Sequence, residues 1–143
     1  GFSMGGGMTW LVIREHPERF AAAVPCCPRT DYIGDFAELD RLAALPIWCI
    51  HGEGDAVTPP DLSERLKKVL LKNAARSGAD TRFLILPTGY LFPDGVTKTP
   101  VDHLVWIPMF SNLLYNDGTK YRDRDGSEVQ STLIKWLGEQ VLK

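Results

Sequence analysis

The first residues of this chain have the types and the spacing that nucleophilic catalysis requires. Residues 1–5 read GFSMG, which matches the G-x-S-x-G turn that raises a serine at the junction of a strand and a helix. We expect Gly1 and Gly5 to be needed because a side chain at either position would collide across the turn. The helix that follows would present the Met4 N–H beside Ser3, where it could bind an oxyanion. The alternative is a glycine-rich flexible terminus or a turn at a helix start, without chemistry.

A serine nucleophile needs a base that takes its proton, and the sequence contains three histidines. His16 precedes a proline at a predicted helix end, where we interpret it as a residue that caps carbonyl groups. His51 ends a predicted strand, and we interpret it as a packed or hydrogen-bonded structural residue. His103 follows the last predicted strand, in a loop near aromatic residues. By order and position, His103 is the predicted base.

A carboxylate must hold that base in the tautomer that can accept the proton of serine. Asp55 lies four residues past a strand-ending histidine, on a loop whose backbone N–H groups could orient it. The alternative for Asp55 is an Asx turn with no catalytic role. Three other acidic residues are weaker candidates, and Asp102 ranks low because neighbouring loop side chains usually diverge; the other two are Glu53 and Asp94.

Around these residues the hydrophobic pattern alternates between helices and strands. The predicted elements are a helix over 4–14, a buried strand over 20–27, a helix near 35–44, a central strand over 46–51, a helix capped by Thr58 and ended by Gly78, a strand over 81–86, a solvated loop over 115–126 and a terminal helix opened by a capping box at 127–130. This order predicts an α/β fold: a parallel sheet flanked by helices, with three strands after Ser3. Catalytic residues should then lie at the carboxyl ends of the strands.

Composition narrows the classes of partner and cofactor. The 143 residues are 44% hydrophobic and 24% charged, which is typical of a single globular domain over 1–143. The net charge of −2 argues against nucleic acid as the main partner, and no apolar run has the length of a membrane span. The three cysteines, Cys26, Cys27 and Cys49, lie in apolar runs, so we expect buried free thiols. No metal-ligand spacing is present, so we expect neither a metal nor a cofactor.

Two segments resemble a known fold. Residues 1–6 (GFSMGG) and 45–59 (LPIWCIHGEGDAVTP) look like the α/β-hydrolase fold, and most of all like the phospholipase/carboxylesterase-like and dienelactone-hydrolase-like families. Their pattern is a GxSxGG turn, a strand ending in HGxxDxxVP and a late histidine before aromatic residues. The three motifs occur in that order, and the resemblance extends over nearly the whole chain. The resemblance implies a serine hydrolase that cleaves a small-molecule carboxylic ester through an acyl-enzyme, with Ser3 as nucleophile, Asp55 as acid and His103 as base.

The chain departs from that pattern between its acid and its base. The interval from Asp55 to His103 is longer than these families lead us to expect, and the excess falls in 87–100. Aromatic residues in and near this segment could line the mouth of a substrate pocket; they are Tyr90, Phe92 and Trp106. The alternative is that this aromatic loop packs only on itself.

The resemblance also implies strands that this sequence does not contain. The fold normally carries about five strands before the serine turn, and a loop among them supplies the second oxyanion donor. We therefore expect this chain to be the C-terminal half of a hydrolase domain, with an exposed edge on the strand over 21–27. Such a half would need the missing N-terminal half, a second chain or self-association. The alternatives in function are a serine peptidase of the same fold and a non-catalytic fragment that pairs through that edge.

Overall fold

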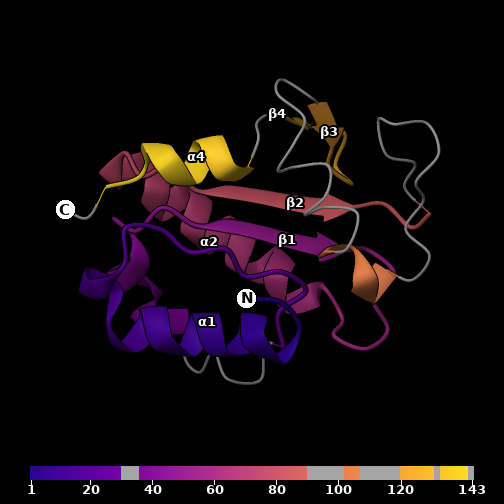
Figure 1. Cartoon of the computed structure of the whole chain (residues 1–143), viewed down its shortest axis with the longest axis horizontal. Helices are drawn as coiled ribbons and strands as arrows, with labels where there is room; N and C mark the ends of the chain where they lie inside the picture. Colours follow the sequence, from indigo (N-terminus) through magenta and orange to yellow (C-terminus); the bar gives the residue numbers. More distant parts are fainter. Residues whose placement is uncertain (30–35, 90–101, 107–119, 131–132, 142–143) are drawn as a thin grey trace.

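The structure is a computed structural model that describes residues 1–29, 36–89, 102–106, 120–130 and 133–141 (Figure 1). Its helices are α1 (Met4–Glu15), α2 (Asp61–Ser77) and α4 (Leu133–Glu139), its 3₁₀ turns are η1 (Pro17–Arg19), η2 (Phe36–Leu42) and η3 (Asp102–Leu104), and its strands are β1 (Trp48–Gly52), β2 (Arg82–Leu86), β3 (Lys120–Arg122) and β4 (Glu128–Gln130). None of the helices in these segments is long and apolar enough to cross a membrane.

The centre of the fold is a parallel pair of strands. β1 pairs with β2 in a register that joins Trp48 to Arg82 and Gly52 to Leu86. Every residue of β1 is buried, as expected for a strand covered on both faces. On the other side of β1 the sheet continues through single parallel bridges, Ala23 to Ile47, Cys26 to Ile50 and Phe2 to Cys26. The predicted parallel sheet is therefore confirmed.

The predicted strand over 20–27 is wrong as a regular strand. This segment forms only isolated bridges, because Pro25 has no N–H and Cys27 turns away with a φ of 40°. Among the residues that the structure describes, two regular parallel strands rather than three follow Ser3. The predicted exposed edge is also wrong for the end of the segment, because Gly1 N–H bonds to Val24 O at 3.0 Å and Cys26 N–H to Gly1 O at 2.8 Å.

Helices cover both faces of the sheet, and each face has its own core. Figure 1 shows α1 and α4 on opposite sides of the strands. Alternate residues of β1 point to the two faces. One core joins the sheet to α4 and consists of Cys26, Cys27, Trp48, Ile50, Leu84, Leu86, Val105, Leu133 and Trp136. The other joins it to α1, η2 and α2 and consists of Trp10, Ile13, Ala23, Leu39, Leu42, Leu45, Ile47, Cys49, Leu66, Leu70 and Phe83. The three cysteines are free and buried, as predicted.

Two predicted helices differ in the structure. α2 begins at Asp61 after Pro60, so Thr58 is not its N-cap. Its predicted end is correct, because Gly78 adopts the left-handed φ of 76° that closes a helix. The segment near 35–44 is a 3₁₀ helix over Phe36–Leu42 within the described residues, not an α-helix.

The predicted capping box at 127–130 is wrong. Residues 128–130 form β4, which pairs antiparallel with β3, and the last helix starts only at Leu133. The hairpin between them brings a buried carboxylate to β2: Asp123 Oδ2 accepts the Ile85 N–H at 2.9 Å, and Arg124 N–H donates to Ile85 O at 2.8 Å. Lys67 Nζ lies 3.3 Å from Asp123 Oδ1 and balances its charge. This part of the predicted solvated loop therefore completes the outer edge of the sheet.

Candidate active site

Ser3 occupies a strained turn between the sheet and α1. Its φ of 53° lies in the left-handed region, which costs a residue with a side chain about 1–3 kcal/mol. The surrounding backbone holds this conformation: Ser3 N–H donates to Cys26 O at 2.9 Å, and Ser3 O accepts from Gly7 and Arg29 at 3.0 and 3.1 Å. α1 begins at the next residue, so the Met4 N–H has no carbonyl one turn earlier in the helix to bond. Met4 therefore lies where an oxyanion donor was predicted.

The structure brings Ser3, His103 and Asp55 together from three distant parts of the chain. Ser3 Oγ lies 3.0 Å from His103 Nε2, and His103 Nδ1 lies 2.8 Å from Asp55 Oδ2. A carboxylate only accepts, so Nδ1 carries the ring hydrogen in the neutral histidine. Nε2 is then an acceptor for the Ser3 hydroxyl. This is the tautomer that a general base for Ser3 needs.

Asp55 is held as an ionised acceptor. Its residue is 3% exposed, and Oδ1 accepts the N–H groups of Val57 and Thr58 at 2.9 and 2.8 Å. Burial by itself would raise the pKa of this carboxyl. Hydrogen bonds from His51, from the Thr58 backbone and from His103 outweigh burial and hold the pKa of Asp55 well below its ordinary value. Asp55 therefore keeps its negative charge beside His103 at neutral pH.

Thr58 is a site residue that sequence reasoning assigned to the wrong role. Its hydroxyl donates to Asp55 Oδ2 at 2.7 Å and lies 3.2 Å from both Cys27 O and His103 Nδ1. The signal was present, because an aspartate followed three residues later by threonine is typical of a local turn in which side chain and backbone bond to each other. The Asx turn considered for Asp55 exists, and the residues of this turn also contact His103.

The glycines of the serine turn differ from prediction. A Cβ at Gly1 would meet Gly5 O at 2.5 Å, so Gly1 is needed as predicted. A Cβ at Gly5 would meet nothing within 4 Å, so its predicted collision is wrong. Gly6 is the tight position instead, since its Cβ would lie 2.8 Å from Cys26 O and 2.9 Å from Pro28 Cα. α1 therefore lies close to the backbone of Cys26 and Pro28 at Gly6.

Two further glycines make room for the turn that carries His103. A Cβ on Gly52 would overlap the Asp102 carbonyl, and a Cβ on Gly54 would overlap the Asp102 carboxylate. His103 in η3 can therefore approach the end of β1 closely. Asp102 itself faces Gly54 rather than the ring of His103, in line with its low ranking.

The other acidic candidates do not replace Asp55 within the described residues. Glu53 contacts Arg124 at 3.4 Å and accepts the Thr88 N–H at 3.3 Å. Asp94 lies outside the described residues. Asp55 is therefore the carboxylate that the described structure places on His103.

Of the three predicted pocket residues, Trp106 lies beside the site. Its ring meets His103 edge-on with 5.0 Å between centroids and stacks on Phe2 at 4.9 Å. Tyr90 and Phe92 lie outside the described residues. Phe2, which sequence reasoning did not single out, is half exposed next to Ser3. Its position inside the G-x-S-x-G motif was the available signal.

One group of side chains near the site has ligand atoms close enough to share a metal ion. Cys27, Asp55 and His103 place one such atom each within 4.8 Å of one another. The chemistry of this set does not favour an ion, because both Asp55 oxygens already accept hydrogen bonds. Burial, and then the charge of Asp55, also raise the pKa of the Cys27 thiol far above its ordinary value, so it stays protonated.

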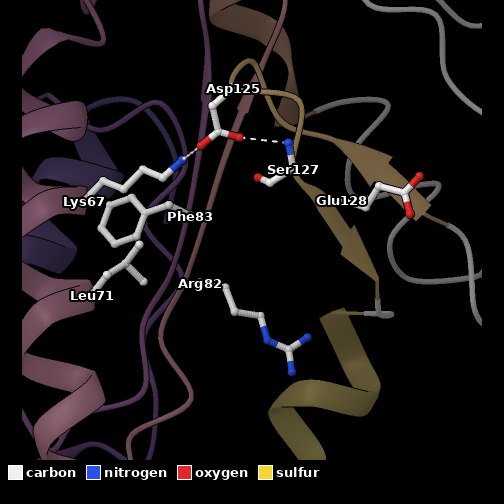
Figure 2. A pocket seen from close by; sticks show the side chains of 7 residues that line it. All are labelled: Lys67, Leu71, Arg82, Phe83, Asp125, Ser127 and Glu128. Carbon is white, nitrogen blue, oxygen red and sulfur yellow. Dashed lines mark hydrogen bonds and ion pairs between the residues drawn. The ribbon is translucent and has the colours of Figure 1, made fainter.

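A separate hollow lies against the outer side of β2, between α2 and the β3–β4 hairpin. Figure 2 shows Lys67 and Leu71 of α2 with Phe83 of β2 on one side and the turn before β4 on the other. Its volume is about 410 Å³. Asp125 bonds to Lys67 at 2.8 Å and accepts the Ser127 N–H at 2.9 Å, so the polar groups on this wall are paired with each other. The residues that line this hollow do not include Ser3, Asp55 or His103.

Comparisons with known proteins agree with this geometry. A profile of the dienelactone hydrolase family matches residues 1–80, a segment that contains Ser3 and Asp55. A solved thermostable esterase is similar to 98% of this chain, with 33% sequence identity and a TM-score of 0.62, and the chain spans 29% of the length of that esterase. A protein of Klebsiella pneumoniae subsp. pneumoniae MGH 78578, provisionally described as a dienelactone hydrolase, has 22% identity and a TM-score of 0.42, with 61% of this chain and 38% of that chain covered. No curated protein matches the sequence. Since the family profile covers more than half of its residues, the chain belongs to the dienelactone hydrolase family and has part of the α/β-hydrolase fold.

Proposed function

We propose that this chain carries the reacting side chains of a serine esterase, which cleaves a carboxylic ester through a covalent acyl-enzyme. The observation that carries the proposal is the unbroken series of hydrogen bonds from Ser3 Oγ through His103 to Asp55. Membership of a hydrolase family and the similarity to an esterase support the same class of reaction. Ser3 is then the nucleophile, His103 the general base and acid, and Asp55 the group that orients His103.

The first half of the reaction acylates Ser3. The hydroxyl passes its proton to His103 Nε2 while Oγ bonds to the carbonyl carbon of the ester. The carbonyl electron pair moves to oxygen, where the Met4 N–H at the start of α1 stabilises it. Collapse of this intermediate breaks the bond to the alcohol oxygen, which takes the proton from His103. The alcohol leaves, and the acyl group stays on Oγ.

The second half hydrolyses the acyl-enzyme. Water gives a proton to His103 Nε2 as its oxygen bonds to the acyl carbon. The bond from that carbon to Ser3 Oγ then breaks, and Oγ takes the proton back from His103. A carboxylic acid is released and the free hydroxyl is restored. Asp55 stays ionised throughout and stabilises each positively charged form of His103.

Apolar side chains flank the nucleophile and support an uncharged substrate. Phe2 and Met4, the neighbours of Ser3 in the chain, are 49% and 63% exposed, and Phe2 stacks on Trp106. Covering such a surface with a hydrocarbon group stabilises a complex by about 25 cal/mol per Å². We therefore expect esters whose groups next to the carbonyl are uncharged. A peptidase remains the second candidate, since the same three side chains can cleave an amide.

We also propose that further polypeptide of the same fold covers the exposed side of α1. Met4, Met8 and Val12 recur every four residues on this helix and are all exposed, which places them on one face. The similar esterase is more than three times as long as this chain, so a protein of that length contains additional polypeptide that could cover the helix. Mass and oligomeric state of the purified natural protein test this point. A stable monomer of residues 1–143 alone would contradict it.

The experiment that tests the proposal is covalent labelling of Ser3 in the natural full-length protein. We expect a fluorophosphonate to label Ser3 at one site, and p-nitrophenyl acetate to be hydrolysed faster than the matched p-nitroanilide. Ser3→Ala should abolish both labelling and turnover, whereas Ser127→Ala, which changes an exposed serine away from the site, should keep both. A folded wild-type protein that is neither labelled nor active on either substrate would count against the proposal. Faster cleavage of the anilide would favour a peptidase.

A further inference from the structure

His51 is a second buried histidine beside Asp55, and it has no part in the proposed proton transfer. It is the fourth residue of β1, and its side chain is fully buried. Its Nε2 lies 2.7 Å from the Thr58 carbonyl oxygen and 3.3 Å from Asp55 Oδ2. Because a carbonyl only accepts, Nε2 must carry a hydrogen and donate it to Thr58. Asp55 is then a second, more distant acceptor of the same hydrogen.

The other ring nitrogen fixes the orientation of His51. Its Nδ1 lies 2.8 Å from the hydroxyl of Ser63, a fully buried residue in the first turn of α2. In the neutral ring Nδ1 accepts the Ser63 hydrogen, and the Ser63 oxygen accepts from the Cys49 thiol at 4.0 Å. Rotating the ring would leave several buried polar groups without partners, which is costly. His51 is therefore held rigidly between β1 and α2.

Asp55 depends on the residue that His51 anchors. Thr58 donates its N–H to Oδ1 and its hydroxyl to Oδ2, at 2.8 and 2.7 Å. His51 bonds the carbonyl of the same Thr58, so it controls the position of the segment that holds the carboxylate. Burial would raise the pKa of Asp55, and the hydrogen bond of His51 is the largest contact that lowers it. His51 thus affects both the position of the Asp55 carboxylate that faces His103 and its ionisation.

We propose that His51 is a positioning residue, which holds Thr58 and Asp55 in the geometry that aims His103 at Ser3. The inference rests on the proposed function, because its kinetic effect is expressed through His103. A displacement of about 1 Å in a catalytic group can lower a rate about 100-fold. His51 lies beyond Asp55 in the series of hydrogen bonds that runs from Ser3 through His103, and it does not contact Ser3, so substrate binding should be unaffected.

The test compares two substitutions of His51 in the natural full-length protein. His51→Phe keeps a ring but removes both nitrogens, and we expect kcat for p-nitrophenyl acetate to fall about 10- to 100-fold with KM within about twofold. His51→Gln keeps an N–H donor near the place of Nε2 and should recover most of the lost kcat. Ser63→Ala removes only the support at Nδ1 and should lower kcat by a smaller factor. His16→Phe changes an exposed histidine and should leave kcat unchanged.

A second measurement separates this inference from the proposed function. The His103 Nδ1–H resonance in the NMR spectrum reports its bond to Asp55 without any turnover. We expect this resonance to shift or broaden in His51→Phe and to return in His51→Gln. If the wild type is inactive, the proposed function fails and the resonance alone decides the role of His51.

Two results would overturn the inference. One is a folded His51→Phe whose kcat and His103 resonance both match the wild type, which would make His51 merely structural. If His51→Phe does not fold, Ser63→Ala decides on the same two readouts. The other is a His51→Gln that is as inactive as His51→Phe, since the N–H donor to Thr58 carries most of the proposed role.

Discussion

Asp55→Asn changes the charge and hydrogen bonding of Asp55 while keeping its shape. The N–H groups of Val57 and Thr58 both donate to Oδ1, so the amide oxygen of asparagine will take that position. Its NH₂ group then occupies the place of Oδ2, 2.8 Å from His103 Nδ1. Nδ1 must now accept, which moves the ring hydrogen to Nε2. The Ser3 hydroxyl then faces a donor and cannot pass on its proton.

The expected loss is large. The same substitution in a Ser-His-Asp triad lowers kcat about 10⁴-fold, or about 5.5 kcal/mol in activation free energy. We expect that loss in the hydrolysis of p-nitrophenyl acetate, with Ser3→Ala as the background. Asp61→Asn removes an exposed carboxylate at the start of α2 and is the matched control, which should keep wild-type kcat. If Asp55→Asn keeps kcat within about tenfold of the wild type, the tautomer argument is refuted.

Three further predictions concern stability, measured as the free energy of unfolding in urea. Because the pKa of Asp55 is lowered on folding, its contribution to stability should be fully present above its ordinary pKa of 3.8 and be lost as the pH falls below that value. The difference in unfolding free energy between the wild type and Asp55→Asn should therefore be the same at pH 7 and pH 5 and smaller at pH 3. A larger difference at pH 3 would contradict the direction of the pKa shift. Trp136→Ala removes a fully buried ring that meets Trp48 edge-on, and it should lower the unfolding free energy by about 3–5 kcal/mol. Leu137→Ala, at a partly exposed position of the same helix, should lower it by less than about 1 kcal/mol. Equal losses would contradict the packing of Trp136 in the core. Gly6→Ala should destabilise by about 1–2 kcal/mol because its Cβ meets backbone atoms, while Gly5→Ala should stabilise by about 0.5–1 kcal/mol because its Cβ meets none; the reverse order would show that the close approach of α1 lies elsewhere.

Parts of the chain whose structure follows from local pattern were predictable. The apolar residues within 46–51 and 81–86 predicted the parallel strands β1 and β2, because a strand that is covered on both faces is apolar at successive residues. The turn over 1–5 gave the start of α1 at Met4. Proximity of Ser3, Asp55 and His103 also followed, since loops at the carboxyl ends of parallel strands share one rim. Their catalytic roles and the pocket residues Tyr90 and Phe92 stay predictions.

Parts that depend on tertiary contacts were not predictable in the same way. The run Ser127–Gln130 matches a capping box, yet Glu128–Gln130 pairs as β4, because Asp125-Gly126 before it forms a hairpin turn with a φ of 85° at Gly126. Thr58 matches an N-cap, yet its hydroxyl bonds to Asp55. In both cases the same short polar motif can form two different structures. Which of them forms depends on a partner that is distant along the chain or outside the helix.

The pairing of the hairpin with β2 has a consequence for how this protein behaves at high concentration. The outer side of an edge strand offers free backbone groups to which another molecule can add a strand. At Ile85 those groups are occupied by Asp123 and Arg124, and the buried charge of Asp123 would have to leave Lys67 before a foreign strand could replace it. The hairpin thus covers this edge of the sheet with a charged residue. We expect it to prevent another molecule from adding a strand there, and so to lower the tendency to aggregate along that side.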